Sequence, residues 1–269
     1  MPLTTISEGQ EAFRTHHNYI RSLKRHIEGS TLSYTGVSAI VRAPVPFLNS
    51  KTNLIDLTIL SLKDEAEIVS KDKDYSYAST SWLPIKTYYL LFNMMLTIEY
   101  LFAPERERES FKITHNKCAQ NFTKRLACGE IKFSNLKLNE IYNRDIFCYR
   151  EQSGANLRSA SGFDHTRLAL KKIAQYKQEE WQRQKRIPDF IKPEHRRKKE
   201  EFRRGFQLSV FEFPYHMRLR ANYRDFAFIE GVSSADTARY FNDYFVFAIG
   251  FYKALLSLKS QLEEARAGH

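Results

Sequence analysis

Apolar positions recur at helical spacing along most of this chain. They return every three or four residues from Ser234 to Leu262, and again from Trp82 to Phe102, where Ala103-Pro104 ends the stretch. Further helices are expected at 8–29, 115–126 and 164–181. We therefore predict an all-α fold, with any strand confined to residues before about 62.

The first 75 residues have a less uniform pattern. Val37–Phe47 contains two prolines and is expected to be extended. Leu54–Val69 favours a helix, but its short, dense apolar run leaves a strand over Leu54–Leu62 open. Lys71–Ser81 is a polar link. We place a boundary there, between an N-terminal extension (1–75) and a helical domain (76–265).

The C-terminal helix is apolar on two faces. One face carries Phe241 and Phe245, and the other carries Tyr244 and Phe251, so each needs a set of neighbours. We expect a homodimer to supply one set. A helix surrounded on all sides within one chain is the alternative. Ser233 followed by Asp236 predicts a start resembling a capping box.

Positive charge dominates the composition. The net charge is +11 and the pI about 9.5, which favours an anionic partner such as RNA, DNA or a membrane surface. The segment 171–204 holds 13 Lys or Arg and six Asp or Glu, and is interrupted by prolines. Its densest cluster is a candidate nucleic-acid contact: Arg196, Arg197, Lys198 and Lys199. The alternative is a solvated helix hairpin with local ion pairs.

Other chemistries find little support. Cys118, Cys128 and Cys148 lack metal-knuckle spacing, and no Walker or dinucleotide-binding glycine motif occurs. We expect no metal and no cofactor. The N-terminus has no apolar signal core, and the charge-free run Thr87–Ile98 is too short to span a bilayer. We expect a cytoplasmic protein that does not enter the membrane.

Arginines cluster just before the last helix, between Met217 and Phe226. Guanidinium groups of Arg218, Arg220 and Arg224 could hold a phosphate through paired donors. The alternative is structural, with these arginines paired to Asp225 or Glu230.

The order of these segments resembles a known family. Arg218-x-x-Ala221-Asn222-Tyr223, a break and an amphipathic helix are similar to the end of a HEPN domain, with Asn222 in place of an Asp. Upstream, the aromatic helix Trp82–Phe102 and the helix opening at Thr114-His115 follow the same order. The resemblance covers roughly Ser79–Leu262, with a large insert. It implies an up-and-down helical bundle, a homodimer, and RNA or nucleotide binding in a prokaryotic toxin–antitoxin or phage-defence system.

The resemblance also implies candidate site residues. Arg218, Asn222 and Tyr223 would be catalytic in a metal-independent ribonuclease, with Arg220 and Arg224 contacting nucleic acid. Ribonucleases of the family carry an Arg and a downstream His with four to six residues between them, and Tyr223 stands at such a distance from Arg218 instead. A phenol is a poor general base at neutral pH, so we expect RNA binding without efficient turnover. The alternative is a catalytically inactive module for dimerisation or a partner protein.

His115 and His165 are the next candidates for the missing histidine. Each follows an arginine at a loosely matching distance, Arg108 and Arg158 respectively, and Arg21 with His26 gives a third match. In a chain this rich in arginine, such matches arise by chance.

Overall fold

The computed structural model of the chain describes residues 8–36, 45–103, 111–149, 162–223, 229 and 231–267. These residues are mostly helical, which confirms the all-α prediction. The α-helices are α1 (Glu8–Ile27), α2 (Val45–Lys71), α3 (Ser76–Phe102), α4 (His115–Ala127), α5 (Gly162–Gln184), α6 (Pro193–Arg204), α7 (Phe213–Tyr223) and α8 (Ser234–Ala267). Short 3-10 helices lie at Leu136–Asn139, Arg144–Cys148 and Val210–Glu212.

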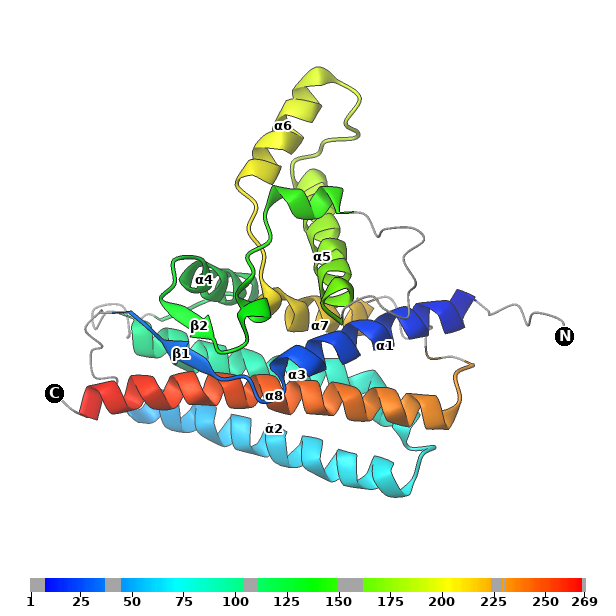
Figure 1. The fold of residues 1–269 in the computed structure, drawn as a ribbon, viewed down its shortest axis with the longest axis vertical. Coiled ribbons are helices and arrows are strands. Elements are labelled where there is room, and N and C mark those ends of the chain that lie inside the picture. The colour runs from blue at the N-terminus through cyan, green and yellow to red at the C-terminus, as the bar shows by residue number, and fades with distance from the viewer. Residues whose placement is uncertain are drawn as a thin grey trace, which may run out of the picture.

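The long helices α2, α3 and α8 run side by side as the base of the molecule (Figure 1). Helix α1 crosses α8, and α5 rises from this base to carry α6 at its outer end. Helix α7 lies by the foot of α5 and packs against α3. None of the described helices combines the length and apolar character that crossing a bilayer requires.

Helix α3 lies at the centre of the core, because every side chain from Leu90 to Leu101 is buried. Helix α8 packs against α3, α1 and β1, and five of its aromatic side chains, from both faces, are at most 1% exposed: Tyr240, Phe241, Tyr244, Phe247 and Phe251. Neighbours in the same chain thus cover most of both apolar faces of α8. These faces give no reason to require a dimer, and the homodimer stays a prediction.

A small antiparallel sheet corrects one expectation. Strand β1 (Leu32–Tyr34) pairs with β2 (Ile131–Phe133), so a strand does lie beyond residue 62. Ile131 and Phe133 are buried on either side of the exposed Lys132. The sequence pattern missed β2 because three residues are too few to establish an alternation.

The N-terminal region is more helical than expected. Helix α2 includes Leu54–Val69, so the helix prediction is confirmed and the strand alternative is wrong. The extended prediction is also wrong for Val45–Phe47, where Pro46 falls in the first turn of α2, a position that tolerates proline. Residues 37–44 lie outside the described residues.

The polar link is shorter than predicted. It narrows to 72–75, where the Asp72 carboxylate accepts from the backbone N–H of Asp74 at 2.9 Å. Helices α1 and α2 pack on α8 and α3, and the division near residue 75 stays a prediction.

Both predicted helix starts are confirmed. The Thr114 hydroxyl caps α4, and the Ser233 hydroxyl accepts from the backbone N–H of Asp236 at 3.1 Å at the start of α8. The return bond differs from a capping box. The Ser233 hydroxyl itself donates to the Asp236 carboxylate at 2.8 Å, because Asp is too short to reach back as Glu does.

Candidate functional site

Arg218 lies on α7 with its guanidinium against two tyrosine rings of α3. The guanidinium carbon is 5.2 Å from the centre of the Tyr88 ring and 5.3 Å from that of Tyr89. Such cation–π contacts hold a positive charge on a hydrophobic surface. Arg218 is half-buried, and its Nε is buried with no hydrogen-bond partner among the described residues.

His115 contacts the same tyrosine. It is the first residue of α4, its ring lies 4.2 Å from that of Phe92, and Nδ1 is hydrogen-bonded to the Tyr88 hydroxyl. Burial lowers the pKa of His115, and the positive charge of Arg218 lowers it further. The imidazole is therefore neutral at pH 7.

The Tyr88 hydroxyl sets the tautomer of this imidazole. Tyr88 is 1% exposed, and burial raises the pKa of its phenol, so it keeps its proton. A buried hydroxyl needs an acceptor, and His115 Nδ1 is the one that the described residues offer. Neutral His115 consequently carries its own proton on Nε2. It can donate a hydrogen bond there, and taking up a further proton at Nδ1 would break its bond with Tyr88.

Arg218 and His115 thus form a cationic and hydrogen-bond-donating site around Tyr88. No carboxylate in the described part of the chain pairs with Arg218. Asp225 and Glu230, the alternative partners considered above, lie outside the described residues. A guanidinium beside an N–H donor is suited to phosphate oxygens.

The other predicted residues of this stretch are only partly placed. The backbone of Arg220, Asn222 and Tyr223 belongs to α7, but their side chains lie outside the described part of the structure. Arg224 lies outside it altogether. Their roles stay predictions.

The basic cluster of α6 is at the outer end of the projecting hairpin, away from α7 (Figure 1). Arg196 donates from Nε and Nη2 to the carbonyl oxygen of Ile191, at 3.1 and 2.7 Å, and so fastens the loop before α6. Lys199 lies over the ring of Phe190 at 4.4 Å. Arg197 is 75% exposed, 3.7 Å from the Glu201 carboxylate, and Lys198 is also exposed. Arg197 and Lys198 are therefore the most accessible cations of the four.

A buried ion pair connects the elements around this site. Lys177 of α5 donates to the carboxylate of Glu212 at 2.6 Å and to the side chain of Asn116 at 3.2 Å. Glu212 is 0% exposed at the residue level. Burial raises the pKa of its carboxyl, and the charge of Lys177 opposes that rise.

The structure also places His17 and the three cysteines. His17 is bonded to Asp243 at 2.8 Å, which ties α1 to α8. The three cysteines are free thiols. Across the described ranges, no group of three or more His, Cys, Asp or Glu could hold a metal ion.

No protein-family model, curated protein or solved structure matches this chain. The site must therefore be interpreted from its own geometry.

Proposed function

We propose that this protein binds single-stranded RNA, with Arg218 and the Nε2–H of His115 holding one phosphate. The observation that carries the proposal is the half-buried Arg218 guanidinium beside His115, with no carboxylate partner among the described residues. The net charge of +11 supports an anionic ligand. We further propose a HEPN-type protein of a prokaryotic toxin–antitoxin or phage-defence system.

The geometry favours binding over efficient cleavage. A ribonuclease without a metal needs a group that takes a proton from the attacking 2′-hydroxyl. The tautomer of His115 presents a donor, and accepting a second proton at Nδ1 would break the bond with Tyr88. Tyr223 is no better as a base at neutral pH.

A second candidate is a module without RNA activity, for dimerisation or a partner protein. Helix α2 favours it, because a row of its apolar side chains is 43–65% exposed: Leu54, Leu57, Leu60 and Ile68. Failure of the protein to bind RNA would favour this candidate.

Salt dependence tests the RNA proposal and the role of α6 together. Arg196 is engaged with Ile191, so we expect the other three cations of the cluster to contact phosphates. Replacing Arg197, Lys198 and Lys199 with Gln should flatten the log–log salt slope of RNA affinity by about 2. Fluorescence anisotropy with a labelled single-stranded RNA, at several salt concentrations, measures this slope.

The matched control removes the same charge elsewhere. Lys63, Lys71 and Lys73 are exposed on and just after α2, far from α6 (Figure 1). Replacing them with Gln should leave the slope nearly unchanged. Equal flattening by both variants would mean that α6 acts only through net charge, and an absence of RNA binding would reject the proposed function.

A further inference from the structure

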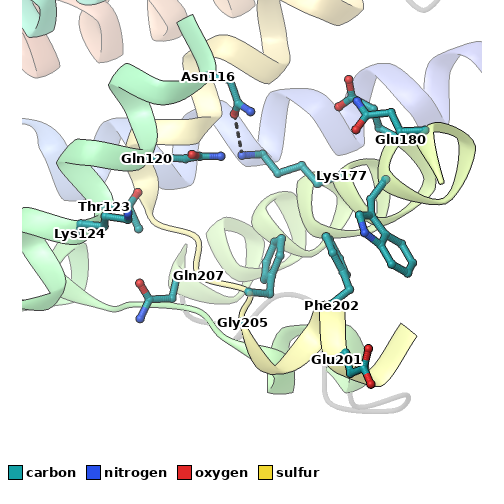
Figure 2. Close-up of a pocket in the computed structure, with 13 residues that line it drawn as sticks. Asn116, Gln120, Thr123, Lys124, Lys177, Glu180, Glu201, Phe202, Gly205 and Gln207 are labelled. Atoms are coloured by element: carbon teal, nitrogen blue, oxygen red, sulfur yellow. Dashed lines mark hydrogen bonds between the residues drawn. The ribbon is translucent and has the colours of Figure 1, made fainter. Parts of the chain in front are cut away.

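A cleft lies between α4, α5 and the C-terminal end of α6 (Figure 2). Its volume is about 530 Å³, within the range of roughly 300–1,000 Å³ that small-ligand sites occupy. Asn116 lines it and directly follows His115 in α4. Asn116 of the cleft and His115 of the Arg218 site are therefore neighbours in the first turn of α4.

One wall of the cleft is aromatic. Trp181 and Phe202 are stacked, with ring centres 4.7 Å apart and planes at 26°, and Phe206 also lines the wall. Trp181 is half-buried. Phe202 covers one face of its indole, and no second ring among the described residues contacts it. Trp181, Phe202 and Phe206 together offer an apolar wall against which a flat ring can pack.

The facing surfaces are rich in amides. Gln120, Gln184 and Gln207 line the cleft, and none of the three side chains makes a hydrogen bond to another described residue. Each amide offers both a donor and an acceptor. Gln120 and Lys177 point toward one another across the cleft (Figure 2). Such groups fit a ligand whose edge alternates donors and acceptors.

The charges of the cleft favour a neutral ligand. The charge of Lys177 is balanced by the buried Glu212. The remaining lining charges are Lys124 on one side and Glu180 and Glu201 on the other. The cleft has no excess of positive charge comparable to that around Arg218, so an anion gains little there.

We propose that this cleft binds a nucleobase of single-stranded RNA. The base packs flat against the aromatic wall of Trp181, Phe202 and Phe206, and its edge bonds to the amides of Gln120 and Gln207. The inference rests on the proposed function, because it gives the base a place next to the site where Arg218 and His115 hold the phosphate.

The fluorescence of Trp181 can be used to test this proposal. The chain has two tryptophans, and the other, Trp82, is 60% exposed on α3. A Trp82→Phe variant therefore leaves Trp181 as the single emitter. We expect saturable quenching of its fluorescence by single-stranded RNA and by free nucleosides, and none by an abasic strand of equal length.

The outcomes separate the two proposals. If RNA binds by anisotropy without quenching Trp181, base recognition in the cleft is wrong while the RNA proposal stands. If RNA does not bind but a nucleoside quenches Trp181, the proposed function fails and base recognition stands. If neither ligand quenches, the cleft is not a base site.

A pair of substitutions tests the amides. Gln120→Leu with Gln207→Leu keeps the volume of each side chain and removes its polar edge. The affinity for RNA and nucleosides should fall at least about fivefold, the effect of losing one hydrogen bond. Gln10→Leu, an exposed change on α1, is the control. Unchanged affinity in the double variant would overturn the proposed contacts.

Discussion

Replacing Lys177 with Met is expected to lower the free energy of unfolding by about 3–5 kcal/mol at neutral pH. The substitution leaves the fully buried Glu212 carboxylate without its cation, and one of its oxygens already has no hydrogen-bond partner in the described structure. Urea denaturation followed by circular dichroism measures the loss. The same change at Lys71, whose ion pair with Glu67 lies on the surface, should have almost no effect.

The loss should depend on pH. The native pKa of Glu212 is raised above its unfolded value of about 4.3, so stability falls as pH rises through the native pKa. Without Lys177 the native pKa rises further. The loss in free energy of unfolding caused by Lys177→Met should thus be larger at about pH 8 than at about pH 5. Adding Glu212→Leu to Lys177→Met should recover stability. If the loss of stability in Lys177→Met does not depend on pH, Glu212 is not the cause of that loss.

The second large effect concerns RNA. Arg218→Ala is expected to weaken binding of single-stranded RNA by about 1.5–3 kcal/mol, or tenfold to 150-fold. The substitution removes a guanidinium that the described structure leaves free of carboxylates. Arg218→Lys keeps the charge but not the paired donors, so its affinity should lie between those of Arg218→Ala and the wild type.

Arg239→Ala is the matched control. Arg239 also lies on a helix, but its side chain is 72% exposed and pairs with Asp236. The Arg239→Ala variant should bind RNA like the wild type. Equal weakening of RNA binding by both alanine variants would mean that Arg218 acts only through net charge. Unfolding curves would detect any loss of stability caused by removing the packing of Arg218 on Tyr88 and Tyr89.

The helices could be predicted because each has a local cause. The periodic apolar stripe of α8 begins at the Ser233 cap, and α3 ends before Pro104. The pattern of α8 alone could not decide whether a dimer forms. A two-faced apolar helix shows that neighbours are needed, but α1 and α3 of the same chain supply them.

The site could not be predicted from local pattern, because its residues are far apart in the sequence. Arg218 and His115 meet only because both pack against Tyr88. The position of His115 directly after the Thr114 cap was the one local signal. Motif spacing had linked His115 to Arg108 instead. The role of Arg196 was equally hidden, because its contact with the Ile191 carbonyl depends on how the loop before α6 folds.

Histidine ring NMR tests the central claim most directly. In protein with ¹⁵N-labelled histidine, His115 should carry its proton on Nε2 at neutral pH, with Nδ1 as acceptor. Adding single-stranded RNA should shift its ring signals and raise its pKa, because a bound phosphate favours the charged imidazole. His17, which is bonded to Asp243 between α1 and α8, serves for comparison. If RNA binds while the His115 signals and pKa stay unchanged, the phosphate does not lie at the Arg218 site.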